Sequence, residues 1–202
     1  MLEAIGLQCV RQQRTLFNSL SFSLAAGERL RIAGANGSGK TSLLRILTGL
    51  LAPSEGEVRW RGEKIGSLEE EYSRQIVYLG HAAAVKDDLT PAENLEIACR
   101  LAGIATEKNR VNEALARLGV PEAAPVRRLS QGQRRRAALA RLVVSEKIPL
   151  WLLDEPYAAL DAQAAATVDS LITAQAARGG AVVYTTHQET GAAPSRVIEL
   201  HA

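Results

Sequence analysis

Cysteine is scarce in this sequence, which has only Cys9 and Cys99 among its 202 residues. The two lie far apart and form no CxxC pair, so the sequence indicates neither a disulfide framework nor a thiolate metal site, and a reduced, cytosolic setting fits better. Long apolar runs are also missing, since no window approaches the roughly 18 apolar residues of a membrane-spanning helix. The N-terminal segment contains the acidic Glu3 and no continuous apolar core, so we expect no signal peptide. If the protein serves a membrane, other chains must cross it.

An excess of one charge is lacking as well. The 24 Lys and Arg residues nearly balance the 22 Asp and Glu residues, for a formal net charge of +2. No global field favours nucleic acid or an anionic membrane surface, so any such contact must be local. Hydrophobic residues make up 47% and charged residues 23%, which excludes a disordered or collagen-like chain. The length fits one α/β domain, since typical domains hold roughly 100 to 200 residues.

Short apolar runs predict two groups of strands. Those around 2–10, 20–24 and 58–60 predict an antiparallel N-terminal layer. A second group predicts a mainly parallel core sheet, because helical patterns lie between some of its members. This second group comprises residues 30–33, 76–79, 150–153, 181–185 and 197–200, and the helical patterns cover 41–50, 111–118 and 163–177.

The segment 82–142 interrupts the strands. It is rich in alanine and in helical patterns, and Pro91, Gly103, Pro121 and Pro125 break it. We interpret it as an inserted helical lobe. The expected organisation is a single domain of residues 1–202, in which 1–81 and 143–202 form a core lobe and 82–142 form the helical lobe.

The sequence GANGSGKT at 34–41 matches GxxxxGK[ST] and lies between an apolar strand and an apolar helix. Its glycines let backbone N–H groups curl round phosphate oxygens, and the helix N-terminus adds the positive end of a dipole. Lys40 is expected to reach the β- and γ-phosphates, and Thr41 to offer its hydroxyl to Mg²⁺. The motif therefore predicts ATP and Mg²⁺ as ligands. The predicted nucleotide-binding residues here are Gly34, Asn36, Gly37, Ser38, Gly39, Lys40, Thr41 and Ser42.

A pair of carboxylates follows the apolar run 150–153. Asp154 is expected to support Mg²⁺, directly or through water. Glu155 comes next, where its carboxylate could polarise the water that attacks the γ-phosphate, provided that it lies within hydrogen-bond reach. Without the phosphate loop, the same pair would indicate only a solvated turn at a strand end.

The sequence LSQGQ at 129–133, followed by an arginine-rich helix, resembles the LSGGQ signature of ABC ATPases. Ser130 would cap the helix, and its hydroxyl, the Gly132 amide and the helix dipole together make an anion site. In that family this site closes on the γ-phosphate held by the opposite subunit, so the resemblance implies a head-to-tail homodimer with ATP at its interface. It assigns Ser130, Gln131, Gly132 and Gln133 to nucleotide binding, with Gln131 in place of the first signature glycine. Taken alone, the segment indicates a capped helix, or a nucleic-acid patch made by Arg127, Arg128, Arg134, Arg135, Arg136 and Arg141.

Four further positions follow from the same resemblance. Asp161 matches the D-loop, and His187 matches the switch histidine that contacts the γ-phosphate and the attacking water. His81 stands where the Q-loop usually has Gln, near Mg²⁺. Arg11 stands where an aromatic residue usually stacks on the adenine; a guanidinium plane can also stack on a base, and the preference for ATP or GTP stays open. The implied catalytic residues are Lys40, Glu155 and His187, and the implied metal-binding residues are Thr41, His81 and Asp154.

The resemblance covers almost the whole chain. It implies an α/β fold: a P-loop NTPase (RecA-like) core with an N-terminal antiparallel β layer and an inserted ABC α-helical subdomain. The segments LGH at 79–81, LSQGQRR at 129–135, WLLDEPY at 151–157 and TTH at 185–187 resemble, in particular, the ATP-binding subunits of cytochrome c maturation, or haem-exporting, systems.

That resemblance implies an ATPase bound peripherally to the cytoplasmic face of the bacterial inner membrane. Its partners would be integral permease subunits like CcmB and CcmC and, indirectly, a haem chaperone like CcmE, whose release hydrolysis would drive. One alternative keeps the ATPase but serves another small-molecule or lipid exporter. A second is a soluble ABC ATPase that works on nucleic acid or ribosomes, although such proteins usually carry two cassettes and no nucleic acid is expected here.

Overall fold

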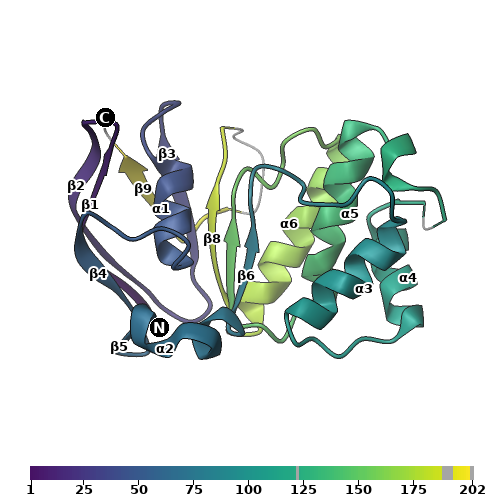
Figure 1. The fold of residues 1–202 in the computed structure, drawn as a ribbon, viewed down its shortest axis with the longest axis horizontal. Coiled ribbons are helices and arrows are strands. Elements are labelled where there is room, and N and C mark those ends of the chain that lie inside the picture. Colours follow the sequence, from purple (N-terminus) through teal and green to yellow (C-terminus); the bar gives the residue numbers. More distant parts are fainter. Residues whose placement is uncertain (122, 188–192, 201–202) are drawn as a thin grey trace.

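Two β-sheets with a helix between them form the core of the computed structural model, which describes residues 1–121, 123–187 and 193–200 (Figure 1). The first sheet is antiparallel, with the order β2-β1-β4-β5. Its strands are β1 (Leu2–Arg11), β2 (Arg14–Leu24), β4 (Glu55–Trp60) and β5 (Glu63–Lys64). The predicted antiparallel N-terminal layer is confirmed, although β2 begins earlier than expected.

The second sheet is parallel, with the order β6-β7-β8-β3-β9, which confirms the predicted core sheet. Its strands are β3 (Arg29–Gly34), β6 (Ile76–Leu79), β7 (Leu150–Leu153), β8 (Ala181–Thr185) and β9 (Arg196–Leu200). In β7, Leu150 and Leu152 pack with α1 (Lys40–Leu47) and the antiparallel sheet, whereas Trp151 and Leu153 pack with helices on the other face. Both faces are therefore buried, which is why this strand is a continuous apolar run.

Helix α1 ends earlier than the predicted range of 41–50. Its last helical residue is Leu47, and Gly49 has φ +78°, in the left-handed region that glycine adopts without steric cost. Leu43, Leu44 and Leu47 are buried as expected, but Leu50 is 70% exposed. Helix α2 (Ile65–Ser73), which lies below the antiparallel sheet in Figure 1, was not predicted.

The chain between β6 and β7 forms α3 (Pro91–Leu101), α4 (Lys108–Arg117), the 3₁₀ turn η1 (Val126–Arg128) and α5 (Gln131–Val144). Figure 1 shows α5 and α6 (Ala162–Ala177) beside the parallel sheet, with α3 and α4 outside them. Thr90 and Ser130 begin α3 and α5 with reciprocal capping boxes. The apolar faces of α5 and α6 pack against the parallel sheet and those of α3 and α4 pack against α5, so this group buries the face of the sheet that α1 leaves open.

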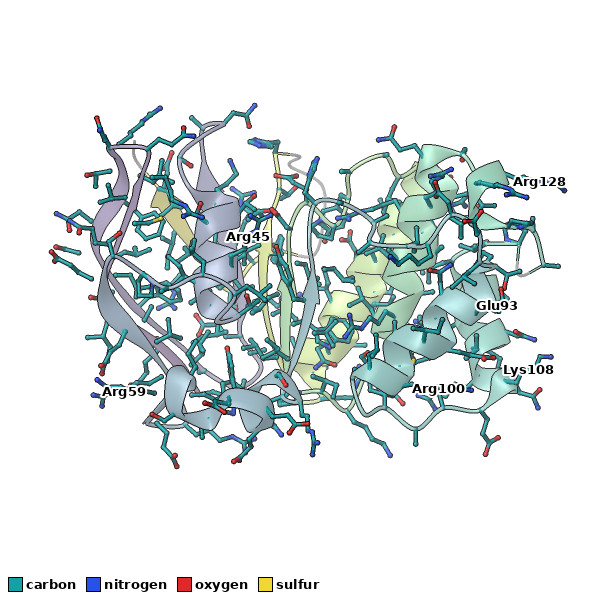
Figure 2. The ribbon with its side chains drawn as sticks, viewed as in Figure 1. Arg45, Arg59, Glu93, Arg100, Lys108 and Arg128 are labelled. Carbon is teal, nitrogen blue, oxygen red and sulfur yellow. The ribbon has the colours of Figure 1, made fainter. Side chains whose placement is uncertain are left out.

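The outer side of this helical group is charged. Figure 2 shows Glu93, Arg100, Lys108 and Arg128 extending outward from it. Among the described residues, no helix is both long and apolar enough to cross a bilayer.

Replacing Leu152 by Ala tests whether β7 is packed on the face that it turns toward α1. Leu152 is fully buried, so Leu152→Ala is expected to lower the free energy of unfolding by about 2–5 kcal/mol in urea denaturation, through lost burial and a residual cavity. The matched control is Leu101→Ala, because Leu101 is 85% exposed on α3 and its loss is expected to stay within about 0.5 kcal/mol. Similar losses in the two variants would contradict this packing.

Candidate nucleotide-binding site

Strands β3, β6, β7 and β8 end at the same edge of the parallel sheet, and each is followed at once by a predicted functional segment. Ligands bind at this carboxyl edge in open α/β sheets. The segments that follow the strands meet around a cleft of about 610 Å³. It is lined by Leu16, Asn36, Gly37, Gly39, Lys40, Thr41, Ser42, His81, Asp154, Glu155 and His187. The structure therefore brings together residues that lie far apart in the chain.

The loop after β3 curls back over the start of α1. Gly37 and Gly39 have φ values of +81° and +100°, and a Cβ on Gly39 would lie 3.0 Å from the ring of Phe17. The Lys40 ammonium, in a residue that is 8% exposed, donates to the carbonyl oxygens of Gly34 at 2.8 Å and Ala35 at 3.0 Å. Backbone N–H groups at a glycine-rich helix start can cradle an anion, and the ammonium lies against the same loop.

Asp154 is buried at the end of β7, with 2% of its surface exposed. Thr41 Oγ1 donates to its Oδ2 at 2.7 Å, and Thr185 Oγ1 donates to its Oδ1 at 2.8 Å. A buried carboxylate is costly unless it is hydrogen-bonded, so these two hydroxyls stabilise it. The Thr41 hydroxyl and the Asp154 carboxylate are hard oxygen donors at one point of the cleft. That fits Mg²⁺, which is commonly bound through one or two carboxylates plus substrate phosphates.

Glu155 has a backbone conformation unusual for a non-glycine residue, with φ +50°. That region costs an L-residue about 1–2 kcal/mol, so its surroundings must hold it there. The Glu155 N–H donates to Thr185 Oγ1 at 2.8 Å, and its carbonyl accepts from Arg135 Nη2 at 2.7 Å. Its side chain points toward His187: Oε2 accepts from the His187 backbone N–H at 3.3 Å, and Oε1 lies 3.5 Å from His187 Nε2.

Sequence reasoning missed two residues of this site. Thr185 bonds both Asp154 and Glu155, and a polar residue at the last position of an apolar strand could have indicated it. Arg135 was interpreted only as part of a basic cluster, but it is 5% exposed and its guanidinium faces the strand ends. Burial lowers the pKa of Arg135, and the carboxylates of Asp154 and Glu155 act in the opposite direction. Its place in one helical stripe with Leu139 and Leu142 was the available signal.

The remaining predicted residues lie outside the cleft lining. Ser130 and Gln133 cap α5: Gln133 N donates to Ser130 Oγ at 3.2 Å, and Ser130 N donates to Gln133 Oε1 at 2.9 Å. Asp161 caps α6 by accepting from Ala164 N at 2.8 Å. Gly34 and Ser38 belong to the phosphate loop but do not line the cleft, and Gln131 and Gly132 are in the first turn of α5.

Arg11, predicted to stack on the base, is exposed at the end of β1 and pairs with Arg14 across the hairpin. The cleft wall next to it is formed by Leu16 of β2. Arg11 is thus not among the residues that line the cleft in this structure.

Comparisons with known proteins give consistent results. A family model described as "ABC transporter" matches residues 17–158. The chain is 48% identical to the cytochrome c biogenesis ATP-binding export protein CcmA of Aromatoleum aromaticum over 203 residues, covering 99% of this chain and 95% of that relative. It is also 48% identical to the CcmA of Nitrosomonas europaea, covering 94% and 89%.

Among solved structures, the dimeric post-hydrolysis state of an ATP-binding cassette bound to ADP and Pi is similar, with a TM-score of 0.85 and 24% identity. The likeness covers 99% of this chain and 94% of that one. It shows a shared fold, which confirms the predicted P-loop NTPase architecture with its β layer and helical insertion.

Replacing Thr185 by Val tests its double role. Thr185→Val keeps the side-chain shape but leaves Asp154 Oδ1 and the Glu155 N–H without their partner, so unfolding free energy is expected to fall by about 1–3 kcal/mol. Urea denaturation measures the loss. Thr185→Ser retains the hydroxyl and is the matched control. A larger loss for Ser than for Val would show that the methyl group, and not the hydroxyl, matters here.

Proposed function

Because this chain belongs to the ABC transporter family and, within it, to the CcmA proteins, we propose that it is the ATP-hydrolysing subunit of an export complex for cytochrome c biogenesis. One observation carries the proposal: Lys40 of the phosphate loop and the adjacent carboxylates Asp154 and Glu155 after β7 come from two distant segments and line one cleft. A cation for phosphates, a carboxylate for the metal ion and a carboxylate for water are the parts that phosphoryl transfer to water requires.

The phosphate loop binds the nucleotide in this account. Backbone N–H groups of Gly37 and Gly39 face the phosphates, and the Lys40 ammonium exchanges the carbonyls of Gly34 and Ala35 for phosphate oxygens. Asn36, Ser38 and Ser42 complete the loop. When bound, Mg²⁺ would neutralise phosphate charge, held by Thr41 and Asp154 with His81 facing the same cleft.

Glu155 acts on the attacking water. Its carboxylate accepts a hydrogen bond from that water and draws off its proton as the water attacks the γ-phosphate. The hydrogen bond from the His187 backbone N–H to Oε2 orients Glu155, and the half-exposed imidazole, 3.5 Å from Oε1, is placed to contact the γ-phosphate. Lys40, Glu155 and His187 are therefore the proposed catalytic residues.

A second copy of this chain completes each site in the proposal. The capped N-terminus of α5, with Ser130, Gln131, Gly132 and Gln133, lies outside the cleft of its own chain and offers free N–H groups at the positive end of a helix dipole. Facing the γ-phosphate of an opposite copy, it would enclose ATP between the two chains, with Asp161 near the interface. The similar cassette of known structure is described as a dimer bound to ADP and Pi.

The proposed partners are membrane proteins. The relatives are named as export proteins, so we place the chain as a peripheral subunit at the cytoplasmic face of the bacterial inner membrane, against permease subunits like CcmB and CcmC. Hydrolysis would drive release of a haem-loaded chaperone like CcmE. The chain acts as one domain with a core lobe of 1–81 and 143–202 and a helical lobe of 82–142; α5 continues to Val144 and so joins the two lobes.

A function on nucleic acid is disfavoured, because three arginines of the cluster are paired with carboxylates of the same chain. Arg127 lies 3.1 Å from Asp88, Arg134 lies 2.8 Å from Asp87, and Arg136 lies 3.9 Å from Asp161. Arginines already close to carboxylates of their own chain are poorly placed to neutralise phosphates. The remaining alternative is an ATPase for another exporter, and Arg11 leaves the choice between ATP and GTP open.

Glu155→Gln tests the proposed chemistry. The amide cannot take a proton from water, so ATP turnover is expected to fall by about 10²- to 10⁴-fold while ATP binding persists and the closed dimer accumulates. Steady-state hydrolysis, a nucleotide-binding titration and size-exclusion chromatography measure the three effects. Glu70→Gln is the matched control, because Glu70 is exposed on α2 and away from the cleft. Unchanged turnover in Glu155→Gln would contradict the assignment.

Affinity purification from native membranes tests the partners. The Glu155→Gln chain with ATP is expected to retain permease subunits like CcmB and CcmC together with a haem-bearing chaperone like CcmE, identified by mass spectrometry. Recovery of a different permease and none of these would contradict the role in cytochrome c biogenesis and leave the ATPase assignment standing.

A further inference from the structure

We propose that Arg135 is a positioning residue that couples the signature end of α5 to the main chain of Glu155 in the same subunit. The inference rests on the proposed function, since it concerns how Glu155 is aligned for hydrolysis. The N-terminal part of α5 is already proposed to face the nucleotide of a second copy. The inference gives the same helix a second role, within its own chain.

The first step is the set of contacts that Arg135 makes. Its Nη1 donates to the carbonyl oxygens of Gly80 at 2.8 Å and His81 at 3.2 Å. Its Nη2 donates to those of Asp154 and Glu155, both at 2.7 Å. One guanidinium therefore joins the ends of β6 and β7, the two strands that deliver His81 and Glu155 to the cleft. The two terminal nitrogens of the planar guanidinium are held at a fixed separation and each serves one strand end, whereas a lysine offers a single nitrogen on a flexible stem.

The second step concerns the strained backbone of Glu155. Its φ of +50° is held from two sides: Thr185 accepts its N–H, and Arg135 donates to its carbonyl. If the donor on the carbonyl side is lost, the backbone can relax toward an ordinary φ. That relaxation rotates the carboxylate away from His187, so the water-activating group loses its alignment without any change in the phosphate loop.

The third step links this contact to the nucleotide of the opposite copy. Ser130, which caps α5, and Arg135 belong to the first turns of one helix. The same helix also touches the segment after Glu155: a Cβ on Gly132 would lie 2.8 Å from the carbonyl oxygen of Ala159, which has φ +61°. Both ends of segment 155–159 thus have left-handed backbone and contact α5. If α5 shifts when its N-terminus binds the γ-phosphate held by the second copy, Arg135 shifts with it and moves the main chain of Glu155.

Arg135→Lys is expected to reduce kcat by about 10- to 100-fold, as a small misplacement of a catalytic group can. KM and the dissociation constant of a non-hydrolysable ATP analogue are expected to stay within about twofold, because the variant leaves the contacts of Lys40 and Thr41 in place. A merely structural role would instead weaken binding and turnover together.

The decisive experiment is a double-mutant cycle on the full chain, assembled with its membrane partners. Arg135→Lys is compared in the wild-type and Glu155→Gln backgrounds, with residual hydrolysis followed in single turnover. If Arg135 acts through Glu155, Arg135→Lys has little left to disturb once the carboxylate is replaced. In the Glu155→Gln background it is therefore expected to change the hydrolysis rate by no more than about twofold. If Arg135→Lys reduces the hydrolysis rate by the same factor in both backgrounds, or raises KM, the proposal is overturned.

Arg141→Lys is the matched control, because Arg141 is a second arginine on α5 that is at least partly buried and lies beside Cys99. It is expected to leave kcat within about twofold. Should Arg135→Lys fail to fold by circular dichroism, the same cycle is run with Arg135→Gln, whose amide can still donate to one strand end. A wild-type assembly that hydrolyses no ATP would sink the proposed function itself, and this inference with it, before any variant is compared.

Discussion

The carboxylate of Asp154 is buried at the carboxyl edge of the parallel sheet, and its two hydrogen bonds fix where the surrounding elements lie. Thr41 brings the start of α1 to one oxygen, and Thr185 brings the end of β8 to the other. A charge this deeply buried is tolerable only while both partners stay in place. The Asp154 carboxylate therefore holds the phosphate loop and the end of β8, which precedes His187, in one arrangement with the end of β7.

Glu155 follows Asp154 directly, and its backbone is strained, with φ +50°. Its left-handed conformation turns the side chain toward His187 instead of continuing the direction of β7. Thr185 and Arg135 hold the two sides of this residue from different elements, one in the core sheet and one in the helical group. Alignment of the proposed catalytic carboxylate thus depends on how the two parts of the molecule pack together, and this packing is the proposed route from the signature helix to hydrolysis.

Much of this could be predicted from the sequence. The parallel strands are continuous apolar runs because both of their faces are buried, and the phosphate loop and the acidic pair are local motifs whose chemistry is set by neighbouring residues. The end of α1 was predicted too late because Leu50 continues the apolar spacing, whereas Gly49 ends the helix. Thr185 and Arg135 were missed because the polar end of an apolar strand and the apolar stripe of α5 indicate burial at most, whereas the roles of the two residues depend on tertiary contacts with Asp154 and Glu155.

The central claim is that the signature end of one copy closes on the nucleotide in the cleft of another. A cysteine pair, Asn36→Cys and Ser130→Cys, tests it most directly in the Glu155→Gln chain in native membranes. Both positions are exposed, whereas the native Cys9 and Cys99 are buried. The account predicts that mild oxidation with ATP gives a covalent dimer on a non-reducing gel and that oxidation without nucleotide gives monomer. A chain that binds ATP but stays monomeric under both conditions would contradict it.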